Sequence, residues 1–279
     1  MASHPAIASG RSAVITGGAS GIGLAAGLRL AGMGMKVCVA DLPGPALDDA
    51  RAQLAAISPD TLAVAADVRE IGDVERLKAE AYGAFGEVAL LMNNAGTGLG
   101  GGPYDHMDRW RRVIEVNLFG VVHGVQAFTP AMLAQGTPCA IVNTGSKQGI
   151  TCPPGDTAYN VSKAGLKALT EGLAHALRNE PGRQVSAHLL VPGSTFTGLT
   201  ARGATEMPEG MWTAAQVVSF MLDGMAAGDF YILCPDNEVT REIDNKRIQW
   251  AADDLIRNRP PLSRWHPDHA AAFKAYLAE

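Results

Sequence analysis

The sequence lacks the features that mark nucleic-acid-binding, membrane and metal-binding proteins. It has no run of Lys or Arg, and 23 basic against 28 acidic residues give a net charge of −5, so we expect no nucleic-acid partner. No apolar stretch has the length of a membrane span, and residues 1–10 carry no cationic start before a long apolar run, so we expect neither a membrane partner nor a secretory signal. The four cysteines (Cys38, Cys139, Cys152 and Cys234) have no metal-ligand spacing, which predicts reduced thiols, a cytoplasmic protein and no bound metal.

Short apolar runs alternate with longer helical patterns along the chain. The runs are apolar on consecutive residues, as from Val88 to Met92, which is typical of strands covered on both faces. The alternation predicts an α/β fold, with one domain over residues 1–279 and a seven-stranded parallel sheet between helices. The predicted strands are Ala13–Ile15, Lys36–Ala40, Leu62–Ala66, Val88–Met92, Ala140–Asn143, Val185–Val191 and Phe230–Cys234, and the predicted helices are Gly23–Gly32, Pro45–Ala56, Val74–Phe85, Met107–Phe128, Ala158–Arg178 and Ala214–Ala227.

A glycine-rich turn follows the first predicted strand and opens a helix. Its sequence is Thr16-Gly17-Gly18-Ala19-Ser20-Gly21-Ile22-Gly23. Such glycines let the backbone turn tightly, and the helix start presents N–H groups to a pyrophosphate. Asp41 closes the second strand, where its carboxylate can accept both ribose hydroxyls and would repel a 2′-phosphate. The pattern favours NAD over NADP. The alternative interpretation of the glycine run is an ordinary turn, and that of Asp41 is an acid at the surface.

Tyr159 and Lys163 are four residues apart in a predicted helix. This spacing places the phenol and the ammonium on one helix face. A free phenol has a pKa of about 10, and a nearby cation favours the phenolate and lowers it. The pair therefore indicates a tyrosine that exchanges a proton with a substrate.

Together these motifs resemble the short-chain dehydrogenase/reductase family, in its shorter NAD-preferring branch. The glycine spacing is Gly-x-x-x-Gly-x-Gly, Asn93-Asn94-Ala95-Gly96 follows the fourth predicted strand, and the likeness extends from about Ser12 to Thr197. The resemblance implies a doubly wound Rossmann fold. It also matches Ser146, 13 residues before Tyr159, with the family's catalytic serine, and Asn117 with its helix asparagine.

The resemblance also implies a set of cofactor contacts. Asp67 and Val68 are expected against the adenine, and the segment from Pro192 to Thr197 against the nicotinamide carboxamide and the phosphates. Taken singly, Asp67 is equally a strand-end cap, Asn117 a satisfied buried amide and Pro192-Gly193 an ordinary turn. The expected NAD contacts are Gly17, Ser20, Gly21, Ile22, Gly23, Asp41, Leu42, Asp67, Val68, Asn94, Ala95, Gly96, Tyr159, Lys163, Pro192, Gly193, Thr195 and Thr197.

The implied activity is an NAD-dependent interconversion of a secondary alcohol and a ketone. Tyr159 is expected to take or return the alcohol proton. Lys163 is expected to lower the phenol pKa and to bind the nicotinamide ribose, while Ser146 donates to the substrate oxygen. Asn117 is expected to anchor a water that links Lys163 to solvent.

The substrate side is expected around a lid over residues 196–215. Flexible Met side chains and aromatic groups there favour a lipophilic or aromatic substrate, although they could equally pack the underside of the lid. Thr97-Gly98-Leu99 is expected to line the same pocket. The expected substrate contacts are Ser146, Gln148, Cys152, Phe196, Met207 and Met211.

The chain departs from the family pattern beyond Cys234. Pro235-Asp236-Asn237 stands where the family's tetramers have Asp-Gly-Gly, and a helical extension over residues 235–279, with a helix from Glu238 to Asn258, is expected. This puts the usual tetramer interface in doubt, so we predict a homodimer, with a homotetramer as the alternative. His266-Pro267-Asp268-His269 resembles a small metal cluster, but Asp268 is more simply a first-turn or capping acid.

Two other functions compete with the dehydrogenase hypothesis. One is a catalytically silent NAD-binding regulator on the same fold, and the presence of all four expected catalytic residues argues against it. The other is the family's sugar-nucleotide epimerase or dehydratase branch, which the glycine spacing and the modest C-terminal region disfavour.

Overall fold

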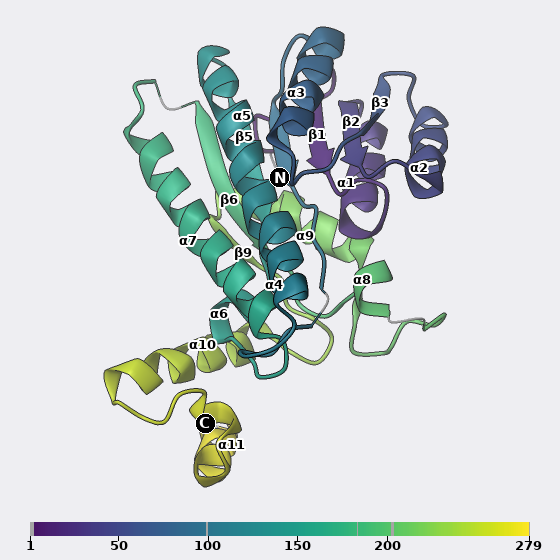
Figure 1. The fold of residues 1–279 in the computed structure, drawn as a ribbon. Coiled ribbons are helices and arrows are strands. Elements are labelled where there is room, and N and C mark those ends of the chain that lie inside the picture. The colour runs from purple at the N-terminus through teal and green to yellow at the C-terminus, as the bar shows by residue number, and fades with distance from the viewer. Residues whose placement is uncertain (1–2, 99, 183, 202–203, 279) are drawn as a thin grey trace.

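One parallel sheet forms the centre of the protein. The computed structural model describes residues 3–98, 100–182, 184–201 and 204–278. The sheet has seven strands in the order β3-β2-β1-β4-β5-β6-β9 (Figure 1), so the predicted seven-stranded parallel sheet is confirmed. The strands are β1 (Ser12–Thr16), β2 (Lys36–Asp41), β3 (Thr61–Ala65), β4 (Leu90–Asn93), β5 (Cys139–Thr144), β6 (Val185–Val191) and β9 (Tyr231–Leu233).

The strand order reverses direction at β1. Ile15 in β1 lies opposite Val39 of β2 on one side and Met92 of β4 on the other. The chain segments that leave β1 and β4 therefore diverge at the carboxyl edge of the sheet. In open parallel sheets this is where ligands bind, and the glycine turn and Asn94 both emerge there.

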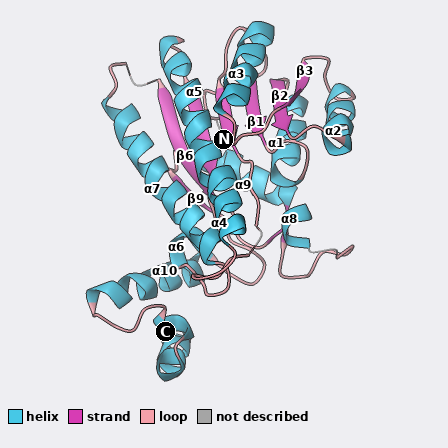
Figure 2. Cartoon of the chain, viewed as in Figure 1, coloured by secondary structure: helices cyan, strands magenta, loops and turns pink. Residues whose placement is uncertain are grey.

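Helices cover both faces of the sheet (Figure 2). Successive strand residues point to opposite faces, so Ile15 packs in the core beneath α1, α2 and α9, whereas Val14 packs beneath α3, α5 and α7. Double coverage explains the consecutive apolar residues of the strands. The helices are α1 (Gly21–Gly32), α2 (Pro45–Ala55), α3 (Ile71–Phe85), α4 (Met107–Ile114), α5 (Gly120–Ala134), α6 (Gln148–Thr151), α7 (Thr157–Asn179), α8 (Gly198–Ala201) and α9 (Ala214–Ala227).

The helix predicted from Met107 to Phe128 differs in the structure. A π-helical segment, η1 (Glu115–Phe119), separates α4 from α5, and α5 continues through Pro130 to Ala134. A π-turn widens the helix by one residue, as is frequent at functional sites. The combined helix over residues 107–134 is 28 residues long and apolar enough to span a membrane, which corrects the expectation that no segment has that length. Length and composition alone are weak evidence for a membrane span, because core helices pass the same test, and α5 packs against the sheet.

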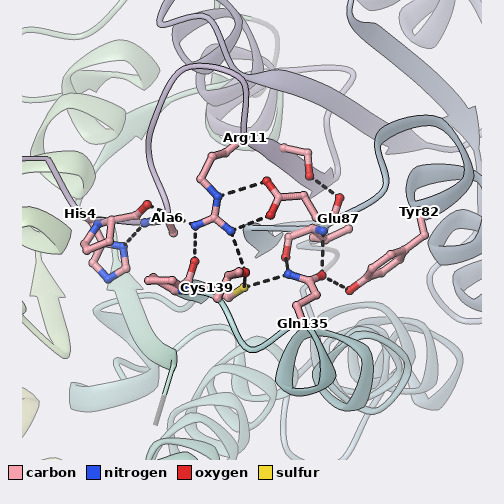
Figure 3. A network of polar contacts seen from close by, with 12 residues as sticks. His4, Ala6, Arg11, Tyr82, Glu87, Gln135 and Cys139 are labelled. Atoms are coloured by element: carbon pink, nitrogen blue, oxygen red, sulfur yellow. Dashed lines mark hydrogen bonds and ion pairs between the residues drawn. The ribbon is translucent and has the colours of Figure 1, made fainter. Parts of the chain in front are cut away.

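The N-terminal segment is fastened at the amino edge of the sheet, opposite the glycine turn. The Arg11 guanidinium donates to both carboxylate oxygens of Glu87, at 3.1 and 2.8 Å. Gln135 extends this network by donating to the Val88 carbonyl and to the Cys139 sulfur and by accepting from Tyr82 (Figure 3). The network joins the start of β1 to α5 and β5.

The C-terminal extension forms a helical hairpin that projects from the body (Figure 1). Trp250 lies 7% exposed between the rings of Phe273 and Tyr276, and its indole N–H donates to Ser263. The hairpin therefore has a small core of its own. Its elements are α10 (Arg241–Ile256), the 3₁₀ turns η2 (Ser263–Trp265) and η3 (Pro267–His269), and α11 (Ala270–Ala278), and β7 (Thr195–Phe196) and β8 (Trp212–Thr213) pair separately near the lid.

Candidate active site

The glycine turn packs too closely for any larger residue. A Cβ added to Gly23 would lie 2.1 Å from the Gly17 carbonyl oxygen, and one added to Gly17 would lie 2.6 Å from the Cα of Ala95. Ser20 occupies the N-cap position of α1, but its side chain forms no capping hydrogen bond, and the first turn of this helix holds no acidic residue. The helix start therefore offers its amides to an anion.

Asp41 lies beside this turn. Its carboxylate accepts hydrogen bonds from the amides of Ala19, at 3.0 Å, and Leu42, at 2.8 Å. The turn and the acid, 22 residues apart in sequence, thus form one binding surface. A pyrophosphate on the helix start and a ribose at the carboxylate fit this arrangement.

Asn94 joins the ends of three strands. Its side-chain amide donates to the carbonyl oxygens of Thr16, at 3.3 Å, and Gly17, at 3.2 Å, and its oxygen accepts from Thr144 at 3.2 Å. The Thr16 hydroxyl accepts in turn from the amides of Asn94 and Ala95. These bonds fix the glycine turn against β4 and β5.

Tyr159, Lys163 and Ser146 converge at the end of β5. Asp156 is the N-cap residue of α7, since its side chain accepts from the Tyr159 amide at 3.1 Å. The Lys163 ammonium is 5.8 Å from the centre of the Tyr159 ring and donates to the Thr144 carbonyl at 2.7 Å. Ser146 accepts from the Gln148 amide at 3.1 Å.

Burial dominates the electrostatics of both Tyr159 and Lys163. Burial raises the pKa of Tyr159, a hydrogen bond with Ser146 lowers it, and the charge of Asp156 raises it. The Lys163 ammonium donates to the neutral carbonyl of Thr144, and burial lowers its own pKa to about 8; its effect on the Tyr159 pKa stays a prediction. The protein alone therefore favours a neutral phenol next to a lysine that loses its proton easily.

Asn117 lies within the π-helical segment and is fully buried. Its side-chain oxygen accepts from the Thr97 amide at 2.7 Å, and its nitrogen donates to the Thr97 carbonyl and to Ser162. A Cβ added to Gly96 would lie 3.5 Å from this oxygen and 3.8 Å from the Lys163 nitrogen. The structure thus brings Asn117 close to Lys163.

Asp67 and Val68, the two residues expected against the adenine, have protein partners of their own. Arg69 forms hydrogen bonds with the Asp67 carboxylate and thereby lowers its pKa. The buried Val68 presents its carbonyl to His123 at 2.8 Å and its side chain to Gly120. Both residues follow β3, at the same edge of the sheet as Asp41.

The loop after β6, from Pro192 to Thr197, lies between the glycine turn and the loop that carries Ser146. Thr195 is buried in the short β7–β8 pair, and the Thr197 side chain lies 3.2 Å from the position of a Cβ on Gly21. Pro192 accepts, through its carbonyl, a long 3.5 Å hydrogen bond from the Lys147 amide. This loop therefore contacts both the glycine turn and the serine loop.

The expected substrate residues are less tightly gathered. Gln148 starts α6, and Cys152 ends it with a φ of 44°, while burial raises the pKa of the Cys152 thiol. Phe196 lies in β7, whereas Met207 is 41% exposed and Met211 lies in the turn before β8. A Cβ on Gly98 would lie 3.5 Å from Leu199 and 3.9 Å from Tyr159, and Leu99 lies outside the described residues.

Three residues of the site were given no role from the sequence. Thr16, the first residue of the glycine motif, and Thr144, the last residue of β5, act through their hydroxyl and backbone groups. Asp236 accepts from the Ser194 amide at 3.2 Å, and its position in the departure after Cys234 is the signal that could have found it. Asp268 lies in the first turn of η3, as one of the two alternatives predicted, and His266 is the capping residue, since its ring accepts from the Asp268 amide. In the described ranges no cluster of His, Cys, Asp or Glu is arranged to hold a metal.

Sequence comparison gives a match over most of the chain. A family model described as short chain dehydrogenase matches residues 11–207. The 1-deoxy-11-beta-hydroxypentalenate dehydrogenase of Streptomyces exfoliatus is 34% identical over 263 residues, covering 91% of this chain and 94% of that protein. The 3beta-hydroxysteroid dehydrogenase 2 of Eggerthella lenta is 32% identical, covering 71% of this chain and 76% of its own.

Solved structures give the same picture. A short chain dehydrogenase/reductase from Burkholderia phymatum, in complex with NAD, has a TM-score of 0.83 and 34% identity over 91% of this chain and 97% of that one. A putative short-chain dehydrogenase from Novosphingobium aromaticivorans has a TM-score of 0.78 and 26% identity, covering 97% of this chain and 95% of its own.

Proposed function

The chain belongs to the short-chain dehydrogenase family, an oxidoreductase family acting on CH–OH groups, and from that membership we propose that it interconverts a secondary alcohol and a ketone with NAD. The observation that carries the proposal is the convergence of Tyr159, Lys163 and Ser146 beside the glycine turn. When bound, NAD supplies the hydride carrier and, in its oxidised form, a positive ring that favours a phenolate nearby. The chain itself supplies the binding surface and the proton.

NAD fits the residues that are present. The tight approach of Gly17 and Gly23 and the uncapped start of α1 suit a pyrophosphate, and the Asp41 carboxylate suits ribose hydroxyls and repels a 2′-phosphate. The NAD-bound neighbour from Burkholderia phymatum supports the same cofactor. We therefore propose NAD rather than NADP.

Tyr159 carries the proton in this proposal. With its raised pKa it is the acid that protonates the ketone oxygen in reduction, and as phenolate it takes the alcohol proton in oxidation. Ser146 donates to the substrate oxygen, and Lys163 binds the ribose and passes the proton towards Asn117 and solvent. The pKa of about 8 at Lys163 suits such a transfer near neutral pH.

The substrate class follows from the lid and the relatives. The lid over residues 196–215 exposes Leu199 and Met207, 45% and 41% accessible, and apolar side chains beside the site favour a lipophilic or aromatic alcohol. Relatives named for hydroxypentalenate and hydroxysteroid support this class. Within the proposal the protein is a cytoplasmic homodimer, to be tested by light scattering against a tetramer.

The test is a panel of steroid-like, aromatic and sugar alcohols, each incubated with NAD while NADH absorbance is followed. We expect turnover with the first two groups, loss of nearly all turnover in Tyr159→Phe, and unchanged NADH binding. Tyr104→Phe is the matched control, because that side chain is 93% exposed. Unchanged turnover in Tyr159→Phe would refute the assignment, and NAD binding without any turnover would favour the silent regulator.

A further inference from the structure

A buried ionic cluster links the C-terminal extension to the serine loop. Lys147 directly follows Ser146, and its ammonium lies 2.6 Å from an Asp244 oxygen and 3.6 Å from an Asp236 oxygen. The two carboxylates are each 5% exposed, and the Lys147 side chain 18%. Burying three charged groups is costly unless they are held in one geometry, so the cluster is a fixed point of the structure.

The cluster reaches both loops of the proposed site. On the serine side, Lys147 is the N-cap residue of α6, and its carbonyl accepts from the amides of Ile150 and Thr151. On the cofactor side, Asp236 accepts from the Ser194 amide, and a Cβ on Gly193 would lie 2.8 Å from the Asp236 carboxylate and 3.2 Å from the Lys147 side chain. One ammonium therefore lies against both loops.

The neighbouring turn holds the lid in the same way. Asn237 donates to the carbonyl oxygens of Glu209, at 2.8 Å, and Met211, at 3.1 Å, and accepts from the Trp212 indole. Asp236 also accepts from the amides of Glu238 and Val239, which fixes the path into α10. The segment that departs from the family pattern thus contacts the serine loop, the loop after β6 and residues 209–212 of the lid.

We propose that Asp244 and Asp236 are positioning residues, which align Ser146 and the Gly193–Ser194 loop through the ammonium of Lys147. The inference rests on the proposed function, and it gives the C-terminal extension a role in positioning Ser146. Arg247 and Arg264 line a cavity of about 30 Å³ together with Lys147 and Asp244, so α10 and η2 add two further cations beside the two carboxylates.

The central test is Asp244→Asn, with Glu242→Gln, an exposed acid in the first turn of the same helix, as the matched control. We expect kcat to fall on the order of ten-fold, because a small misplacement of a catalytic group is costly, while the KM for the alcohol and the NADH dissociation constant stay within about two-fold. Hydrogen exchange should rise in residues 145–151. The control should match the wild type throughout.

A second variant removes Lys147 and Asp244 together, as Lys147→Met with Asp244→Leu. Asp236 then loses its ammonium partner but keeps the backbone amides of Ser194, Glu238 and Val239 as donors. The variant should therefore fold with a melting temperature close to that of the wild type, yet show the same loss of kcat. A lowered melting temperature with normal kcat in Asp244→Asn, or a double variant with wild-type kcat, would overturn the proposal. A wild-type protein inactive on the whole panel would refute the proposed function instead, and unchanged exchange in residues 145–151 would still refute the positioning role.

Discussion

Replacing Lys163 by Met should stabilise the protein while abolishing turnover. The Lys163 side chain is 4% exposed, and its ammonium donates to the neutral Thr144 carbonyl. Burial lowers its pKa from 10.5 to about 8, which means that the folded state disfavours the charged form. Methionine fills a similar volume without a charge, so the folded state gains.

The magnitude follows from the pKa shift. Each pKa unit corresponds to about 1.36 kcal/mol, so the charged lysine costs the folded state about 3 kcal/mol at pH 7. The hydrogen bond to Thr144 is worth about 1 kcal/mol. We therefore expect Lys163→Met to raise the free energy of unfolding by about 2 kcal/mol at neutral pH.

The pH dependence gives the decisive check. Below pH 8 Lys163 is protonated in both states and the full cost is present. Between pH 8 and 10.5 the unfolded lysine keeps its proton while the folded one loses it, so the stability of the wild type rises with pH. The advantage of Lys163→Met should vanish across this window.

Urea unfolding of both proteins from pH 7 to 10 measures this difference. Lys167→Met is the control, since Lys167 lies one turn later on α7, pairs with Glu171 at 2.7 Å and is 36% exposed, and its loss should change the free energy of unfolding by less than about 1 kcal/mol. A Lys163→Met protein that is less stable than wild type at pH 7, or whose advantage does not depend on pH, would refute the reasoning.

Three further predictions test the cofactor end and the opposite edge of the sheet. Gly23→Ala should weaken NADH binding about ten-fold or more in a fluorescence titration, because its methyl group would meet the Gly17 carbonyl at 2.1 Å; Gly32→Ala, which has open space at that position, should not. Asp41→Ser should shift the ratio of NAD to NADP turnover about 100-fold towards NADP, since it removes a charged acceptor and a repulsion. Arg11→Met should lower the free energy of unfolding by about 1–3 kcal/mol without changing kcat, because it breaks a charged pair far from the site.

The cofactor end could be predicted from the sequence because its chemistry is local. Glycines that permit a tight turn, an acid at a strand end and a Tyr-Lys pair on one helix face leave fixed spacings in the chain. The seven strands could be predicted for a similar reason, since each is buried on both faces. Asn117 was matched by resemblance, but the π-turn that carries it was not predicted, because its sequence is that of an ordinary apolar helix.

The cluster around Lys147 could not be predicted, because its members are 89 and 97 residues apart and become neighbours only when β9 adds beside β6. The raised pKa of Tyr159 could not be predicted for a related reason. The spacing gives the helix face of Lys163, but the direction of its ammonium depends on the Thr144 carbonyl, which belongs to another element. The sequence therefore predicts which functional groups are present. It predicts less readily which partners surround them, and these partners decide whether a group is charged.

Two largely buried lysines contact the segment around Ser146, and their partners suit them to opposite tasks. Lys147 meets the carboxylates of Asp244 and Asp236, so its positive charge is held in place and can anchor a loop. Lys163 donates to a neutral carbonyl, and its pKa of about 8 lets it give up a proton near neutral pH. The proposed mechanism needs an anchor for the loop that carries Ser146 and a separate proton carrier. The different partners of the two amines suit them to these two roles.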